Sequence, residues 1–174
     1  MIYMVEMGFT AHGLRAKWDD WYFSHMQMLI TIPGIRASQR FEAQHDCLQP
    51  FVALHEVTGP EVFTSEAYKA KAGPASTGQW RELHKNWGRN VYSGMEHTPD
   101  IAEDAFLLIA ESGYEGNLPP DMEQHVLRSV GLDRNPPRRV LAVGHQPASV
   151  MRTIGKPGIR VLKPLTPRIV AGQV

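Results

Sequence analysis

Residues 18–41, WDDWYFSHMQMLITIPGIRASQRF, decide how the first part of the chain folds. Apolar and aromatic side chains recur here at helical spacing, and one histidine shares their face. Pro33 and Gly34 are predicted to end the helix, and the strand that follows carries Arg40. An imidazole and a guanidinium on successive elements can serve a pocket beneath the helix, or they can be purely structural. The predicted helix face consists of Trp18, Trp21, Tyr22, His25, Met28, Leu29 and Ile32.

Residues 1–96 are predicted to form one antiparallel α+β unit. Alternating side chains predict strands at 2–9, 34–43, 51–58 and 89–95, and helical patterns cover 14–32 and 61–72. The order β-α-β-β-α-β is that of a ferredoxin-like sheet with its helices on one face. Val5, Phe41 and Ala53 indicate that the other face is also apolar, and pairing two such sheets in a symmetric homodimer would cover it.

Residues 97–174 are predicted to be a C-terminal α/β extension. An apolar strand is expected at 104–111, a helix at 118–132, and further strands at 139–145 and 159–162, before an extended tail with three prolines. The order of these elements is similar to that of the first part, so the extension can also be interpreted as a shortened second repeat, although no residue-level repeat supports it.

Composition limits the partners and the compartment. Lys+Arg and Asp+Glu both number 18, so the formal net charge is zero, which argues against nucleic acid and permits self-association. The single cysteine, Cys47, excludes an intramolecular disulfide and fits a reducing compartment. The N-terminus is too short and polar for a signal peptide, and no apolar run reaches membrane-spanning length. We therefore expect a cytoplasmic protein with no membrane partner.

The pattern W-x-x-W-Y-x-x-H, followed by P-G-I and R-F, resembles the dimeric α+β barrel superfamily and its EthD-like groups. The matching residues are Trp18, Trp21, Tyr22, His25, Pro33, Gly34, Ile35, Arg40 and Phe41. The resemblance implies a homodimer with a pocket between helices and sheet, into which a helix histidine at the position of His25 points. Members include cofactor-free monooxygenases, lactone isomerases, decarboxylases and haem proteins, so the fold does not fix the activity.

Three residues are candidates for catalysis. His25, in apolar surroundings, would stay neutral and act as a general base. Arg40 would hold a carboxylate or enolate oxygen, and Tyr22 or Tyr92 would donate to a phenolate or enolate. The alternatives are a core histidine bonded to a backbone carbonyl, and an ion pair of Arg40 with Glu42 or Glu56.

Aromatic side chains and one further histidine would form the wall of a site for a flat organic ligand, although core packing explains such residues equally well. No HxH, HExxH or CxxC spacing occurs, so we predict no metal site and no cofactor, with haem on His84 as the less favoured alternative. The predicted substrate-binding residues are Trp18, Trp21, Met28, Trp87, Tyr92 and His55.

The leading hypothesis is a small-molecule enzyme of aromatic-compound catabolism. It would act on an aromatic or lactone-type organic acid or a phenol by proton transfer, as an isomerase, decarboxylase or cofactor-free monooxygenase. The alternatives are a non-catalytic ligand-binding or assembly protein of the same fold, and a haem-binding protein. The proton-transfer hypothesis requires His25 and Arg40 to reach one shared cavity.

Overall fold

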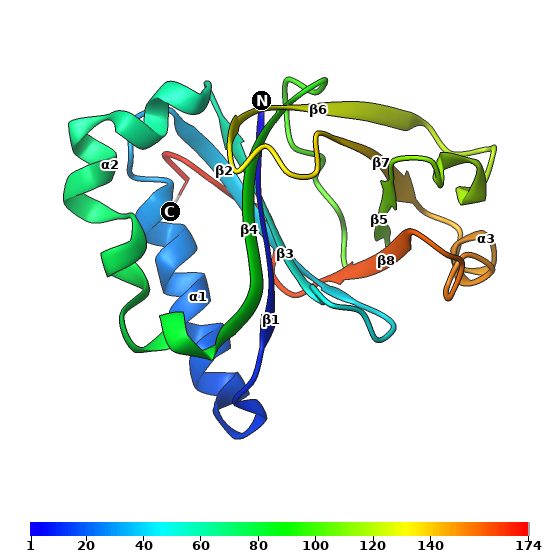
Figure 1. The fold of residues 1–174 in the computed structure, drawn as a ribbon, viewed down its shortest axis with the longest axis horizontal. Helices are drawn as coiled ribbons and strands as arrows, with labels where there is room; N and C mark the ends of the chain where they lie inside the picture. Colours follow the sequence, from blue (N-terminus) through cyan, green and yellow to red (C-terminus); the bar gives the residue numbers. More distant parts are fainter. Residues whose placement is uncertain (174) are drawn as a thin grey trace.

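The structure is a computed structural model that describes residues 1–173, apart from the side chains of residues 74 and 75. It consists mainly of strands, with few helices (Figure 1). The helices are α1 (Arg15–Leu29), α2 (Glu66–Lys71) and α3 (Pro147–Met151), with 3-10 turns η1 (His12–Leu14), η2 (Pro60–Thr64), η3 (Pro74–Leu83) and η4 (Glu115–Asn117). The strands are β1 (Ile2–Phe9), β2 (Ile35–Ala43), β3 (Phe51–Val57), β4 (His84–Ser93), β5 (Phe106–Glu111), β6 (Gln124–Leu132), β7 (Arg138–Gly144), β8 (Ile159–Pro164) and β9 (Ile169–Val170).

Eight of these strands close into an antiparallel barrel. Its order is β2-β3-β1-β4-β6-β7-β5-β8, and β8 pairs with β2 to complete the circle. The pairs β4–β6 and β2–β8 join the first part of the chain to the second, and β9 adds a short pairing to β2. Each part contributes four strands in matching order, β4-β1-β3-β2 and β8-β5-β7-β6. The chain therefore supplies both halves of its own barrel.

The prediction of a helix at 118–132 is wrong. The two prolines there lie in a loop, and residues 124–132 form strand β6 between β4 and β7. Hydrogen-bonding partners on both sides satisfy its backbone, and this tertiary setting overrides the weak helical pattern. The second half consequently lacks a counterpart of α1.

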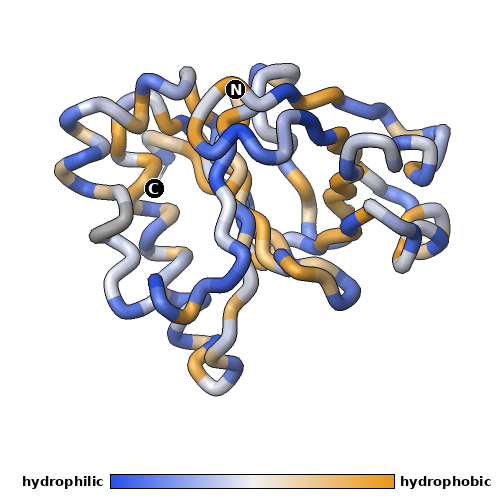
Figure 2. The backbone as a smooth tube through the Cα atoms, in the orientation of Figure 1, coloured by the Kyte–Doolittle hydropathy of each residue, from blue (hydrophilic) through white to orange (hydrophobic). Residues whose placement is uncertain are grey.

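The buried apolar side chains form three cores, and one of them fills the barrel interior. It contains Phe41, which packs with Leu107 and Ile109 of the other half, whereas Val5 and Ala53 lie on the helix side of the sheet. The prediction that these three residues share one uncovered face is wrong, because β2 and its neighbours present them to different sides. The second half of the chain covers the inner face (Figure 2). A homodimer is not needed for that purpose and stays a prediction.

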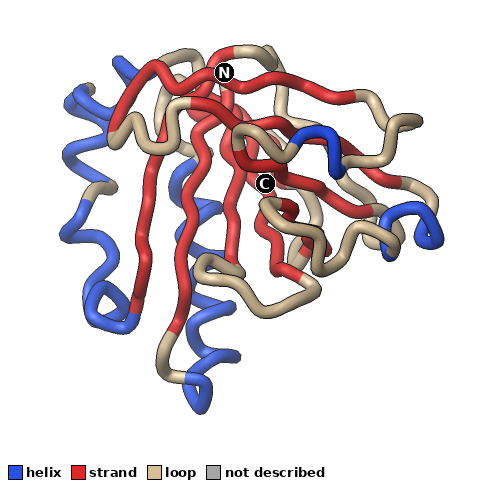
Figure 3. Tube along the Cα trace, turned by 45° about the vertical axis from the view of Figure 1, so that its right-hand side comes forward, coloured by secondary structure: helices blue, strands red, loops and turns tan. Residues whose placement is uncertain are grey.

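Helix α1 packs on the outer face of the first four strands, with α2 beside it (Figures 1 and 3). Its buried side chains, Trp18, Tyr22, Met26 and Leu29, are spaced as one helical stripe. The chain then turns at Gly34, whose φ of 94° suits glycine. A Cβ there would also lie 2.5 Å from Cγ2 of Val62. After this turn, strand β2 runs back beneath helix α1.

Candidate functional site

A small cavity lies between α1 and the outer face of β1, β3 and β4. Its free volume is about 40 Å³, which holds a few water molecules. Segment 73–77 contributes to the wall opposite the sheet. The lining residues are Tyr3, Val5, Met7, Trp21, Tyr22, His25, Leu29, His55, Tyr68, Gly73, Ser76, Thr77, His84, Trp87 and Arg89.

His25 lies on this wall, where the helix periodicity predicted it. Its ring stacks on Trp21, with centroids 5.1 Å apart and planes inclined by 19°, and meets the edge of Tyr22. Burial, followed by the nearby His84, lowers the pKa of His25 to about 4. The imidazole is therefore neutral at pH 7 and able to accept a proton.

The other two histidines of the cavity are held by hydrogen bonds. His55 is 1% exposed, its Nδ1 lies 2.7 Å from Ser38 Oγ, and burial lowers its pKa to about 3. His84 Nε2 accepts a hydrogen bond of 3.0 Å from the indole N–H of Trp18. Burial, followed by the charge of Arg40, lowers the pKa of His84 to about 4. Both rings are neutral and fixed in orientation.

A second polar group in the cavity consists of Tyr3, Tyr68 and Arg89. Burial raises the pKa of Tyr3 well above its ordinary value and also raises that of Tyr68, while Arg89 opposes both shifts through charge and hydrogen bonding. The guanidinium of Arg89 lies over the ring of Trp87, 4.7 Å from its centroid. Both tyrosines therefore keep their hydroxyl protons beside a permanent cation.

Sequence reasoning missed this group. The signal lay in strand alternation, since Tyr3 shares a face of β1 with Val5, and Arg89 shares a face of β4 with Trp87. The missing information was the strand pairing, which sets Tyr3 opposite His55 and Val5 opposite Arg89.

Arg40 does not line this cavity, so the prediction that it shares one with His25 is wrong. The proton-transfer hypothesis is therefore wrong in the form that uses Arg40 to hold the oxyanion. Its side chain is 1% exposed and pairs with Asp19, Nη1 to Oδ1, at 2.6 Å. Its guanidinium stacks on Trp18 and Tyr22, 4.1 and 4.4 Å from their centroids. Arg40 lies under the first half of α1 and borders a separate groove beside residues 165–167. Its partner is also neither Glu42 nor Glu56.

The predicted wall residues divide into two groups. Trp21, Trp87 and His55 line the cavity, together with Tyr22. Trp18 is fully buried against Phe9, with centroids 4.2 Å apart, and does not reach the cavity. Met28 packs at the margin of the core under α1. These two residues support the helix rather than the site.

Tyr92 is the third predicted wall residue that lies elsewhere. It belongs to the apolar core inside the barrel, and its hydroxyl donates a hydrogen bond of 3.2 Å to Pro136 O. Its side chain and that of Arg89 differ by an odd number of positions along β4, so they point to opposite faces of the strand. Tyr92 is therefore a structural residue.

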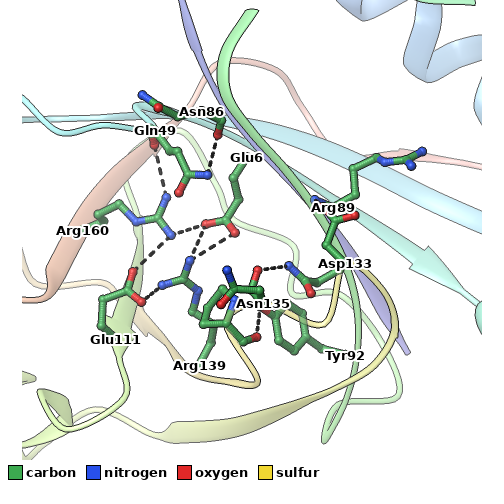
Figure 4. Close-up of polar contacts among 12 residues, drawn as sticks. Glu6, Gln49, Asn86, Arg89, Tyr92, Glu111, Asp133, Asn135, Arg139 and Arg160 are labelled. Carbon is green, nitrogen blue, oxygen red and sulfur yellow. Dashed lines mark hydrogen bonds and ion pairs between the residues drawn. The ribbon is translucent and has the colours of Figure 1, made fainter. Parts of the chain in front are cut away.

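Inside the barrel, Figure 4 shows a cluster of charged residues on the inner side of the same sheet. Arg139 Nη2 donates to the two carboxylate oxygens of Glu6 at 3.1 and 3.2 Å, and Arg160 donates to the same carboxylate. Glu111 pairs with Arg139 at the rim. The guanidinium of Arg89 points away from this cluster. The inner charges are thus neutralised among themselves.

Neither a metal site nor a haem site is formed by these residues. Within the described part of the chain, no three His, Cys, Asp or Glu side chains are grouped so as to hold a metal ion. His84, the predicted haem ligand, has its Nε2 engaged by the indole N–H of Trp18, so this nitrogen is not available to an iron ion. The residues do not fit haem. Among residues 1–173, no helix has both the length and the apolar character needed to span a membrane.

Comparison with known proteins identifies the fold. No protein-family model matches the sequence, and no curated protein matches it. A protein from Lactobacillus acidophilus NCFM, provisionally described as a monooxygenase, superposes with a TM-score of 0.55 at 7% identity, over 98% of this chain and 96% of that one. An anthrone oxidase-like protein gives 0.55 at 12% identity, over 99% and 93%. A provisionally described chlorite dismutase gives 0.53 at 11% identity, over 95% of each chain.

These neighbours belong to the dimeric α+β barrel superfamily, and this chain shares their fold. The fold that the resemblance of residues 18–41 implies is confirmed, whereas membership of the superfamily stays a prediction. Assignment to the EthD-like groups stays a prediction. Because identity is 7–12%, the likeness concerns the fold alone.

Proposed function

We propose that this chain is a small-molecule enzyme that binds an aromatic or lactone-type organic compound in the cavity under α1 and removes a proton from it with His25. The single observation that carries the proposal is the neutral imidazole of His25 on the wall of an aromatic-lined cavity. Such a histidine can accept a proton without first losing one. The first half of the barrel would be a ferredoxin-like unit, and the second half would repeat its strand order without a helix that corresponds to α1.

The chemistry needs an acidic proton on the ligand. A base with a pKa of about 4 is weak, so the anion that forms must be stabilised where it forms. Tyr22 lines the same cavity, and burial raises its pKa to about 12, which keeps its hydroxyl proton available for donation. Tyr22 would therefore donate to the developing oxyanion while Trp21 and Trp87 contact the ring.

The fold neighbours support one reaction class over the others. Isomerisation, decarboxylation and cofactor-free oxygenation all begin with a stabilised anion. One neighbour is named as anthrone oxidase-like and another is described as a monooxygenase, which favours oxygenation of an enolate or phenolate.

The cavity must enlarge to admit a ring. Binding sites for drug-sized ligands span about 300–1,000 Å³, whereas the free volume here is about 40 Å³. Gly73, Ser76 and Thr77 form part of the wall, and their side chains are small. Entry of a ligand would move these residues away from the sheet and enlarge the cavity beneath them.

Hydrogen–deuterium exchange at C10 of anthrone tests the proposal without assuming the later steps. The wild-type chain in D₂O should accelerate exchange, as followed by proton NMR, and His25→Gln should lose about a hundredfold or more of that rate. His125→Gln, a histidine on β6 outside the cavity, is the matched control and should match wild type.

Equal exchange rates for wild type and His25→Gln would overturn the assignment of His25. Binding of anthrone with no accelerated exchange would favour the second candidate function, a ligand-binding protein of the same fold. Melting temperatures of the variants, measured in parallel, separate loss of chemistry from loss of folding.

A further inference from the structure

We propose that Arg89, Tyr3 and Tyr68 form an anion clamp, and that the ligand of the cavity is an aromatic carboxylate. This inference rests on the proposed function in one respect only, namely that the cavity binds a small molecule. It names the substrate class of that site and the residues that select it.

The charge balance of the cavity is the first argument. Arg89 is the one permanently charged residue among the described lining residues, and none of them is acidic. The three histidines of the lining are neutral, as shown above. A guanidinium facing a largely apolar cavity without a counter-charge favours an anionic ligand.

The absence of a protein counter-ion is the second argument. Within residues 1–173, the ion pairs of arginine involve residues 15, 40, 138, 139, 160 and 168, and none involves the Arg89 side chain. Asp133 accepts a hydrogen bond of 2.7 Å from the backbone N–H of Arg89. Figure 4 shows the guanidinium extending away from that carboxylate toward the helices. Asp133 therefore bonds the backbone of Arg89 and does not pair with its guanidinium.

The two tyrosines make the site specific for an oxygen anion. Both keep their hydroxyl protons, the hydroxyl of Tyr3 hydrogen-bonds to that of Tyr68, and Arg89 hydrogen-bonds to both. A ligand oxygen would take the place of these contacts and accept from Arg89 and the hydroxyls. Tyr3 is held between His55, 5.1 Å away, and Phe63, 4.5 Å away, and Tyr68 packs on Phe63 at 5.1 Å between centroids. Because their rings are already fixed, little ordering remains to be done on binding.

A carboxylate matches this set of donors. It offers two oxygens with about four acceptor positions, and a planar guanidinium with two hydroxyls can fill most of them. With the carboxylate at Arg89, the ring of the ligand would extend along Trp87 and Trp21 toward His25. That orientation places the reacting end of the molecule at the proposed base.

Calorimetric titration of the full chain with acid and amide pairs tests the clamp. The probes are benzoate and 2-naphthoate, each compared with its uncharged amide. Wild type should bind each acid at least tenfold more tightly than its amide. Arg89→Gln should weaken binding of the acids about 30-fold and leave the amides unchanged, while Arg89→Lys should keep part of the preference. Arg128→Gln, an exposed arginine on β6, should behave as wild type.

Three outcomes would overturn the clamp: equal affinity for acid and amide, unchanged acid binding by Arg89→Gln, or no binding of any probe to folded wild type. The first two leave the proposed function standing if His25→Gln still loses the exchange of anthrone protons. Conversely, acid binding that depends on Arg89 without exchange that depends on His25 keeps the clamp and removes the proton-transfer role.

Discussion

The two faces of strand β1 carry buried polar groups of opposite kinds. On the inner face, Glu6 lies between Arg139 and Arg160, and its charge is fully paired. On the outer face, Tyr3 lies in a cavity with neutral His25 and with Arg89, whose charge has no carboxylate partner among the lining residues. Burial alone is therefore a poor guide to function. The two faces differ in whether an oppositely charged side chain of the protein pairs with the charge.

This difference has a physical consequence. A paired charge inside the barrel holds β1 of the first half to β7 and β8 of the second, so it contributes to specifying the fold. An unpaired charge on the outer face contributes little to the fold and remains available to a ligand. Variants that break the charge cluster of the inner face should change stability, and variants of Arg89 and Tyr3 on the outer face should change binding.

Glu6→Gln should give the largest effect. Burial by itself would raise the pKa of Glu6, but Arg160 and Arg139 outweigh it and hold the pKa below its usual value. Removing the negative charge leaves two buried guanidiniums with only the partly exposed carboxylate of Glu111 as a counter-charge. We expect unfolding to become easier by about 3–5 kcal/mol in urea denaturation. Glu103→Gln, on an exposed loop, should stay within about 0.5 kcal/mol. A Glu6→Gln chain as stable as wild type would mean that the cluster is not what joins the halves.

The next effect concerns pH and the outer face. Because the folded pKa of His55 is about 3 and the unfolded value is about 6.5, the unfolded chain binds more protons between these values. The contribution of His55 to stability is complete above pH 6.5 and is lost as the pH falls toward 3.

The loss between pH 7 and pH 5 should be about 2 kcal/mol for His55, with His25 and His84 acting in the same direction. His55→Gln should flatten this dependence by that amount, whereas His125→Gln should not. Staying above pH 5 keeps the protonation of Glu6 out of the measurement. The same slope in wild type and His55→Gln would show that His55 is already solvated in the folded chain.

The sequence predicts which face of its strand or helix a side chain occupies. Alternation in 2–9 and 34–43 correctly separates Phe41 from Arg40, and the helix stripe correctly directs His25 to the sheet. These are local properties with periods of 2 and 3.6 residues.

The rest depends on pairing across the chain. Arg40 and Arg89 are indistinguishable as single arginines on strands, and only the register decides which one meets Asp19 and which one meets the cavity. The closure of the barrel by β6 and β8 is also non-local, which is why the cover of the inner face was assigned to a second chain.

The smallest effect comes from a matched pair of tyrosines, one on each face. Tyr92→Phe removes one hydrogen bond of 3.2 Å to Pro136 O, so unfolding should become easier by about 1 kcal/mol, and benzoate binding should not change. Tyr3→Phe removes a hydroxyl from the proposed clamp, so benzoate should bind severalfold more weakly while stability changes little, because the packing of the ring on His55 and Phe63 remains. Urea denaturation and calorimetry on both variants give a two-by-two result. If the two tyrosines affect stability and binding alike, the sheet does not separate structure from function. If Tyr92→Phe changes only stability and Tyr3→Phe changes only binding, the inner hydroxyl is structural and the outer hydroxyl belongs to the binding site.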